Sequence, residues 1–471
     1  MEKTRIKLGY CPTRRDVFSR EEAIRYAGLI KDIISKYDID IVDIDGINED
    51  NLLYRLEDLE TIEKRFRDFG VDAVFFPHCN FGSEALVSQL AKNLNVPVLL
   101  WGPRDDAPDP VTGMRTRDSQ CGLFATGKIL RRHKVPFTYL TNSWYDSDDF
   151  KNGFEKFLGV ASVVKAFRNL RILQISTRPE PFNSVICNEG ELMENFNVHV
   201  YPVTLTTLTR KMDELKNEKE VLETAEFIKK EISPNSSEEG ILKMASMKHA
   251  IKALCDDFGC RAAAIQCWND MQDMTGIMPC LANALLADEG IPVACETDIC
   301  GAVSAVMLQA AAMNEKAHFF ADITIRHPED DNKELLWHCG AFPYSLAKNK
   351  DESFAGEHWI LPSKAYGTCM WEIKGGDVTV VRFDGDNGEY RLLVGEAEGT
   401  DGPKTGGSYL WIKVKDWAAW EHKLVKGPYI HHVAGIHGKY AEILAEACKY
   451  IPGVTVDAAE PSVDELERRW Y

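Results

Sequence analysis

The feature that most constrains this chain is the alternation of short apolar runs with amphipathic segments in its N-terminal part. The apolar runs have the length of strands and lie at residues 5–11, 40–44, 72–77 and 96–101. Between them, segments 20–37 and 83–94 place apolar residues at helical spacing. Because parallel strands need a crossover connection, usually a helix, this order predicts βαβ units and a parallel sheet.

The same alternation restarts further along the chain. Strand-like apolar runs lie at residues 171–176, 198–203, 262–268 and 291–295, with a long charged helical segment at 208–257. After about residue 313 short apolar runs separated by turn residues dominate, at 318–325, 376–383, 389–399 and 408–414, before a helix predicted at 434–451. Such closely spaced strands are typical of an antiparallel barrel or sandwich.

These patterns predict an α/β protein with two Rossmann-like parallel-sheet domains and a β-rich, barrel-like C-terminal domain. The expected boundaries are residues 1–167, 168–312 and 313–471. A chain of 471 residues is long enough for two or three cores of ordinary size.

Charge and cysteine usage exclude several classes of function. The net charge of -18 argues against nucleic-acid binding, which needs a dense basic surface. No apolar run approaches the roughly 20 residues of a membrane span, and the N-terminus MEKTRIKLGYC lacks the apolar core of a signal peptide, so we expect a cytosolic protein. The 13 cysteines contain no Cys-x-x-Cys pair, which excludes the usual zinc knuckles and predicts reduced, buried thiols.

One apolar stretch carries carboxylates where burial is expected. VACETDICGAVSAVMLQAA, residues 293–311, consists mostly of small apolar residues yet contains Glu296 and Asp298. Burying an unpaired carboxylate costs several kcal/mol, roughly, unless a partner, a proton or a metal compensates it. Glu296 ends a predicted strand, and ligands in open α/β sheets bind beyond the carboxyl ends of strands. Asp298 is also explained as the N-cap of the helix that follows.

Two further places combine an apolar context with side chains that bind metals. Asp322 lies in HFFADI, and His431 and His432 lie in GPYIHHVAG. With Glu296 they offer two carboxylates and an imidazole, a set that suits a divalent ion such as Mn²⁺. The ordinary alternative for each acid is a helix cap or a surface residue.

A family resemblance bears on these alternatives. The segments AAIQCW, TGIMPCLANALLADEGIPVACETDIC, HFFADI, LWHCGAFP and the histidine pair occur in the order found in the L-fucose isomerase and L-arabinose isomerase superfamily of ketol isomerases. The chain most resembles the shorter, fucose-isomerase-like branch, which FGSEALVSQLAKNLNVPVLLWGPRDD near the N-terminus also matches.

The resemblance implies roles for these residues. Glu296 and Asp322 fall on the two acids that bind the metal and transfer the proton, and the following valine aligns His431, with His432 as the alternative, on the metal histidine. The metal is usually Mn²⁺, with Mg²⁺ and Co²⁺ as alternatives. Aldose–ketose isomerisation moves a proton between C1 and C2 through an ene-diol, which requires a base, an acid and stabilisation of the developing charge. A trimer or hexamer is also implied.

Other polar residues are candidates for sugar contacts. Gln266 and Trp268 lie at a predicted strand end, and His338 lies where the family places a sugar-contacting segment. A tryptophan there is explained equally well as part of the core. Arg14 and Arg15, in the loop after the first strand, pair with surface acids in one interpretation and bind an anionic sugar in the other, across a subunit boundary.

The sequence thus predicts a metal-dependent aldose–ketose isomerase of a free, fucose- or arabinose-like monosaccharide. The first alternative is the same reaction on an anionic hexose such as a 6-sulfo sugar of the sulfoquinovose type, with Arg14 or Arg15 binding the anion. The second is a non-catalytic sugar-binding protein, since two α/β domains around a cleft also describe such receptors. A pure binder has no reason to bring metal ligands together.

Overall fold

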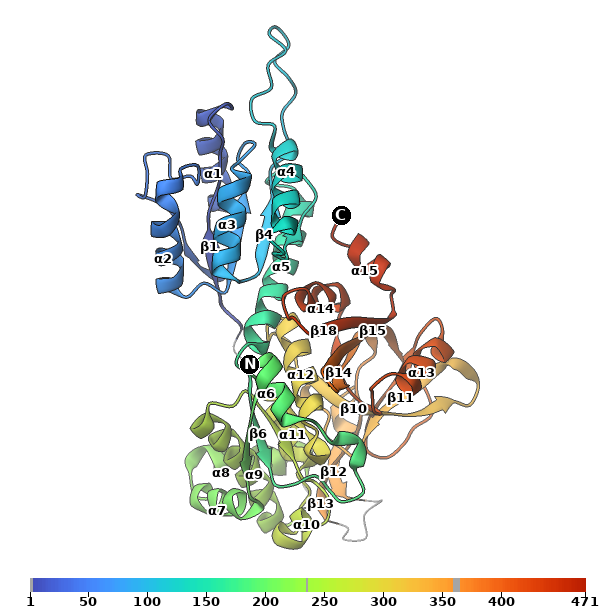
Figure 1. The fold of residues 1–471 in the computed structure, drawn as a ribbon. Coiled ribbons are helices and arrows are strands. Elements are labelled where there is room, and N and C mark those ends of the chain that lie inside the picture. Colours follow the sequence, from blue (N-terminus) through green and yellow to red (C-terminus); the bar gives the residue numbers. More distant parts are fainter. Residues whose placement is uncertain (1–2, 234–235, 359–364) are drawn as a thin grey trace. The chain divides into compact units, whose positions relative to one another are not determined.

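The computed structural model describes residues 3–233, 236–358 and 365–471, and the chain divides into two compact units (Figure 1). The smaller unit comprises Thr4–Lys165 with Glu446–Pro452 and Asp464–Tyr471. The larger unit comprises Ala166–Ala445 and Gly453–Val463, together with the start of the chain. Each unit is described by itself below.

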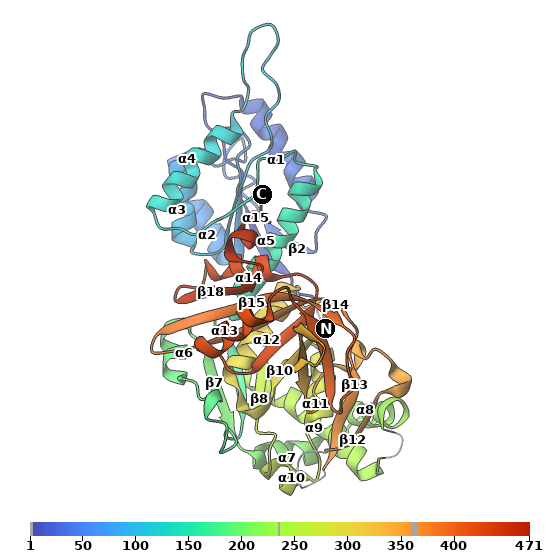
Figure 2. The same cartoon turned by 90° about the vertical axis from the view of Figure 1, so that its right-hand side faces the viewer.

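The smaller unit contains the first predicted parallel sheet, with strand order β2-β1-β3-β4-β5. Its elements are β1 (Ile6–Tyr10), α1 (Arg20–Ile34), β2 (Ile39–Val42), α2 (Leu59–Phe69), β3 (Ala73–Pro77), α3 (Glu84–Leu94), β4 (Val98–Trp101), α4 (Ser119–Arg132), β5 (Thr138–Tyr139) and α5 (Asp148–Phe167). Helices α1 and α5 lie on one face and α2, α3 and α4 on the other (Figure 2). Since successive strand side chains alternate, Val74 and Phe76 pack with α2 and α3 while Phe75 packs against Phe150 of α5.

The larger unit contains the second parallel sheet, with order β7-β6-β8-β9. Its strands and helices are β6 (Arg171–Ile175), α6 (Glu189–Phe196), β7 (His199–Val203), α7 (Leu205–Leu215), α8 (Lys219–Phe227), α9 (Glu238–Phe258), β8 (Ala262–Ile265), α10 (Asp270–Thr275), α11 (Cys280–Asp288), β9 (Val293–Ala294) and α12 (Ile299–Ala311). The predicted charged helical segment is thus divided among α7, α8 and α9.

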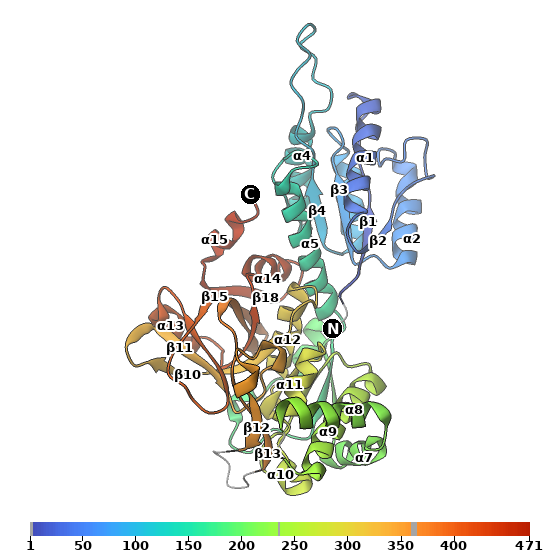
Figure 3. The ribbon, with the colours of Figure 1, turned by 180° about the vertical axis from the view of Figure 1, so that it is seen from behind.

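A nine-stranded sheet follows, with order β12-β13-β16-β11-β10-β17-β14-β15-β18. Its strands are β10 (His318–His327), β11 (Asp330–His338), β12 (Phe354–Glu357), β13 (Tyr366–Glu372), β14 (Gly376–Asp386), β15 (Glu389–Thr400), β16 (Ser408–Lys413), β17 (His432–His437) and β18 (Val454–Glu460), and the accompanying helices are α13 (Trp417–Lys426), α14 (Ala441–Cys448) and α15 (Val463–Arg468). Because β16 also pairs with β15, strands β16, β11, β10, β17, β14 and β15 close into a ring. Figure 3 shows β10, β11 and β15 of this ring near α13. The predicted barrel-like character is confirmed.

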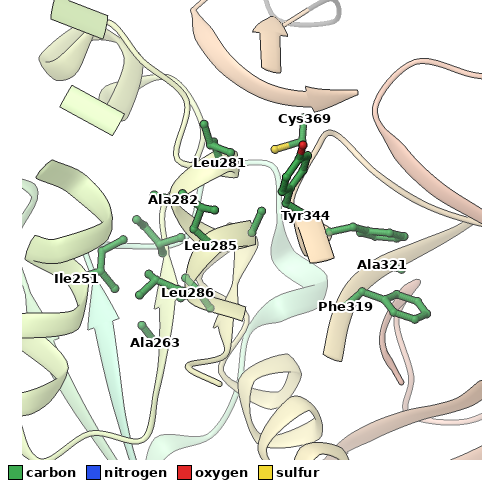
Figure 4. Packing of buried hydrophobic residues seen from close by; sticks show 14 of the residues in the cluster. Ile251, Ala263, Leu281, Ala282, Leu285, Leu286, Phe319, Ala321, Tyr344 and Cys369 are labelled. Carbon is green, nitrogen blue, oxygen red and sulfur yellow. The ribbon is translucent and has the colours of Figure 1, made fainter. Parts of the chain in front are cut away.

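The core of the larger unit joins its parallel sheet to the barrel. Side chains from α9, β8 and α11 pack in one apolar cluster with Phe319 and Ala321 of β10 (Figure 4). Helix α12 contacts strands of both sheets, and every one of its residues is buried. This explains why its sequence is apolar on all sides, and it fixes the N-terminus of α12, with its carboxylates, inside the protein.

The C-terminal region corrects one sequence prediction. Residues His432–His437 form β17 between β10 and β14, and α14 begins only at Ala441, so the helix predicted over 434–451 is wrong in its first part. A short apolar run fits a buried strand as well as a helix, and pairing with two neighbouring strands decides between them. Gly435 permits that pairing, since an added Cβ would lie 2.2 Å from the Phe319 ring.

The fold class of two parallel-sheet regions and a β-rich region is as predicted, whereas the boundaries at residues 167 and 312 stay a prediction. No helix within the described residues combines the length and apolar character that a membrane span needs.

Candidate active site

Glu296 lies in a strained turn between β9 and α12. Residues Cys295–Thr297 form one short 3-10 turn, in which Glu296 and Thr297 have φ of 52° and 58°. Residues other than glycine adopt this left-handed region at a cost in free energy, and such strain clusters at functional sites. Asp298 then caps α12, accepting a hydrogen bond of 2.8 Å from the Gly301 backbone N–H.

Three residues from the barrel meet Glu296. Asp322 of β10 and His432 of β17 are directly opposite each other in the antiparallel register, and directly opposed side chains lie on one face of a sheet. His338 ends β11, the other neighbour of β10. Glu296, Asp322, His338 and His432 are called the four-residue cluster below.

The atoms that face one another in the four-residue cluster are too far apart for hydrogen bonds. His432 Nε2 lies 3.7 Å from Glu296 Oε2 and 3.5 Å from Asp322 Oδ1, and His338 Nε2 lies 3.8 and 4.0 Å from the same two oxygens. Within the described residues, Glu296 Oε2, Asp322 Oδ1 and His338 Nε2 are buried without a hydrogen-bond partner. Two carboxylate oxygens and two imidazole nitrogens converging in this way fit a divalent cation.

The other carboxylate oxygen of Glu296, Oε1, accepts hydrogen bonds from residues that follow β8 of the parallel sheet. Glu296 Oε1 accepts hydrogen bonds from Trp268 Nε1 at 3.1 Å and from Cys267 Sγ at 3.2 Å. Trp268 and Gln266 follow β8, as predicted from their place at a strand end. Gln266 accepts from Ser176 Oγ at 2.6 Å and donates to Asp270 at 3.2 Å, so its amide holds the loops around the site.

A buried ion-pair network orients His432. Asp298 Oδ2 lies 2.8 Å from His432 Nδ1, which leaves Nε2 facing the four-residue cluster. Arg382 of β14 donates to both oxygens of Asp298 and, at 2.7 and 2.8 Å, to Asp384. A carboxylate on the second nitrogen of a metal-binding histidine fixes its tautomer and ring orientation. Arg382 was not among the predicted residues, although a charge in the apolar run VTVVRF carries the same signal as Glu296.

The electrostatics of the cluster keep Glu296 ionised. Burial raises the pKa of Glu296, but the neighbouring His338 and His432 outweigh it and lower the pKa to about 2. Burial lowers the pKa of His432, yet its bond to Asp298 and the charge of Asp322 raise it above the ordinary value.

The two adjacent histidines differ in their surroundings. His432 is buried, with its two ring nitrogens facing Asp298 and the four-residue cluster. His431 is exposed, although one of its ring nitrogens comes within 4.8 Å of ligand atoms of Asp322 and His432. Partial desolvation of the ring by its neighbours lowers the pKa of His431, and the charge of His432 adds to this. The geometry therefore favours His432 over the predicted His431 as the ligand, because strand register selects which imidazole faces Asp322.

Arg14 and Arg15 lie in the smaller unit and are engaged there. Arg14 is buried, donates to Asp50 at 2.9 Å, and stacks 3.5 Å from the Tyr54 ring centre. Arg15 lies 4.1 Å from the Phe81 ring centre and donates to the Gly82 carbonyl at 3.1 Å. Both arginines thus have partners within the smaller unit, but Asp50 is buried and is not one of the surface acids expected for them. Their binding of an anionic sugar stays a prediction.

Comparison with known families is consistent with this site. Residues 9–168 match the fucose/sulfoquinovose isomerase N-terminal domain, and residues 336–458 match the L-fucose isomerase C-terminal domain. The chain belongs to the L-fucose isomerase superfamily. It is 26% identical over 404 residues to a sulfoquinovose isomerase of Priestia aryabhattai, covering 85% of this chain and 88% of that protein. A sulfoquinovose isomerase of Alkalicoccus urumqiensis is 25% identical over 393 residues, covering 82% and 86%.

These matches establish the class of the enzyme. The protein is an isomerase, and its relatives place it among the aldose–ketose isomerases of the fucose isomerase family. A solved periplasmic solute-binding protein from Actinobacillus succinogenes with bound D-allose covers 66% of this chain and 90% of its own, at 12% identity. Its TM-score of 0.18 is too low to indicate a shared fold.

Proposed function

We propose that this member of the superfamily is a metal-dependent isomerase that interconverts an aldose and a ketose at the four-residue cluster. The observation that carries the proposal is the convergence of Glu296 Oε2, Asp322 Oδ1, His338 Nε2 and His432 Nε2. The first three of these atoms are buried and have no hydrogen-bond partner among the residues that the structure describes. These atoms would hold the metal, with Mn²⁺ as the expected ion and Mg²⁺ or Co²⁺ as alternatives. His338, predicted as a sugar contact, takes a ligand position in this arrangement.

The residues of the cluster supply the proton transfer. A bound divalent cation would bind the substrate oxygens on C1 and C2 and stabilise the negative charge that develops between them. Glu296 and Asp322 lie on different elements of the fold. The ionised carboxylate of one removes the proton from one substrate carbon, and the other acid takes that role when the reaction runs in the opposite direction. The low pKa of Glu296 keeps it ionised, and its bonds to Trp268 and Cys267 hold it in place.

The substrate proposal rests on the relatives. Two proteins that match most of the chain are named sulfoquinovose isomerases, which favours a 6-sulfonated hexose over the neutral, fucose- or arabinose-like sugar expected first. The four-residue cluster binds the C1–C2 end of either sugar, so it does not discriminate between them. Assembly into a trimer or hexamer remains an implication of the family resemblance, and a cytosolic location remains a prediction from the sequence.

The test is an isomerase assay on EDTA-treated protein, with and without added Mn²⁺. The substrates are neutral aldoses and 6-sulfonated and 6-phosphorylated hexoses. We expect no turnover without metal, restored turnover with Mn²⁺, and preference for the sulfonated hexose. Restored turnover of a neutral sugar alone would keep the reaction and overturn the substrate. Full activity after metal removal would overturn the metal-dependent mechanism, and sugar binding without turnover under every condition would favour the sugar-binding alternative.

A further inference from the structure

A second group of potential ligands stands on the other side of Glu296. Cys267 Sγ, Cys295 Sγ and a Glu296 oxygen lie within 4.8 Å of one another, and all three side chains are buried. Cys267 Sγ is 3.2 Å from Glu296 Oε1, whereas the imidazoles of the four-residue cluster face Oε2. The carboxylate of Glu296 thus separates a nitrogen- and oxygen-lined position from a sulfur-lined one.

Both sulfur atoms accept hydrogen bonds from N–H groups. The backbone N–H of Glu296 points to Cys267 Sγ at 3.4 Å, and Asn283 Nδ2 donates to Cys295 Sγ at 3.6 Å. Donors of this kind orient metal-binding ligands from outside the site. A purely apolar packing role for the two cysteines requires neither donor.

We propose that Cys267, Cys295 and Glu296 Oε1 form a binding site for a thiophilic divalent cation, Zn²⁺ or Cd²⁺. Two thiolates and a carboxylate are a ligand set that such ions accept, with a fourth position left for water. Binding converts the two thiols to thiolates and releases their two protons to solvent. This chemistry differs from that of the four-residue cluster, whose oxygen and nitrogen ligands suit a harder ion.

Occupation of this site inhibits the isomerase, a consequence that rests on the proposed function. Glu296 belongs to both groups, so a cation on its Oε1 side withdraws negative charge from Oε2 and displaces the hydrogen bond from Trp268. The carboxylate then becomes a weaker base and a weaker ligand for the second metal.

The test of the site is a Cd²⁺ titration of the metal-depleted protein, followed by the ultraviolet charge-transfer absorption of cadmium–thiolate bonds. The variants are the double replacement Cys267→Ser with Cys295→Ser, and the control Cys448→Ser, which removes another buried thiol. We expect the absorption to saturate at one Cd²⁺ per chain in the wild type and in the control, and to be lost in the double variant. Absorption that persists in the double variant, or is missing from the wild type, overturns the proposal.

Two further measurements keep the outcome decisive. If circular dichroism shows that the double variant does not fold, X-ray absorption of the wild-type Cd²⁺ complex counts the sulfur ligands: two support the site, and none overturns it.

Inhibition by Cd²⁺ of the Mn²⁺-supported reaction, relative to each protein's own uninhibited rate, should weaken at least about tenfold in the double variant. Equal inhibition overturns the inhibitory consequence. The absorption result decides the site even in a protein that shows no isomerase activity.

Discussion

Buried charges are treated differently in the two units of this protein. In the smaller unit, Asp50 accepts from Arg14 at 2.9 Å and also pairs with Arg20, so its charge is fully compensated. In the larger unit, Glu296 and Asp322 each turn one oxygen toward imidazole nitrogens at 3.5–4.0 Å, and within the described residues these two oxygens accept no hydrogen bond. A compensated ion pair stabilises a loop, whereas converging uncompensated ligands define a binding site.

The same contrast exists within one turn of chain. Asp298 is hydrogen-bonded to Arg382, His432 and the Gly301 N–H. Glu296, two residues earlier, keeps one oxygen without a hydrogen-bond partner in the described part of the chain. Burial alone therefore does not identify the reacting acid. The distinction lies in whether the surrounding groups satisfy it.

The largest expected effect comes from Glu296→Gln. This change keeps the size of the side chain but removes its charge and basicity, so kcat should fall about 10²- to 10⁴-fold while the fold is retained. Steady-state kinetics with circular dichroism measure this, and Glu398→Gln, at an exposed position on β15, is the matched control. Undiminished activity would sink the catalytic assignment of Glu296.

Arg14→Ala tests the compensated side of the comparison. Removing Arg14 leaves Asp50 with one partner in a buried position, so the free energy of unfolding should fall by about 2–4 kcal/mol in urea denaturation. The same variant tests the predicted anion contact through KM. A rise in KM confined to the 6-sulfonated sugar would give Arg14 a role in substrate binding, and an equal change for neutral and charged sugars would count against one.

Replacing the two histidines separately sharpens the ligand assignment. His432→Ala should weaken Mn²⁺ binding by at least about 10- to 100-fold, since it removes a nitrogen that faces both carboxylates. His431→Ala, at the exposed neighbouring position, should change it less than about threefold. Electron paramagnetic resonance of Mn²⁺ gives both affinities. The reverse order of effects would restore His431 as the ligand.

Glu334 shows what happens to a buried acid without facing imidazoles. Burial raises its pKa to about 7, the charge of Glu421 adds to this, and Arg326 opposes it. Because folded Glu334 holds its proton more tightly than the unfolded chain does, the contribution of this proton to the stability of the fold is complete below the ordinary pKa of about 4.3. This contribution is lost as the pH rises through about 7. Glu334→Gln should therefore stabilise the protein by about 1–2 kcal/mol at pH 8 and not at pH 4. Equal effects at both pH values would contradict the raised pKa.

The sequence by itself determined the periodic features of this protein. Alternating apolar runs and amphipathic helices identified both parallel sheets, since those periods follow directly from strand and helix geometry. The carboxylate in the apolar stretch 293–311 singled out Glu296. The position of Trp268 at the end of a predicted strand indicated that it lies near the same site, where it donates a hydrogen bond to Glu296. The apolar context of HFFADI also pointed to Asp322, and the ligand types indicated a divalent metal. The family resemblance assigned the metal-binding and proton-transfer roles, which stay predictions.

Only the tertiary structure decided which side chains meet. Local pattern cannot reveal that residues 432–437 form a strand between β10 and β14, and this register turns His432, rather than His431, toward Asp322. The same holds for His338, which reaches the cluster from β11, and for Arg382, which reaches Asp298 across 84 residues of sequence. These contacts depend on strand pairing between distant segments, where a shift of one residue moves every side chain to the opposite face of the sheet.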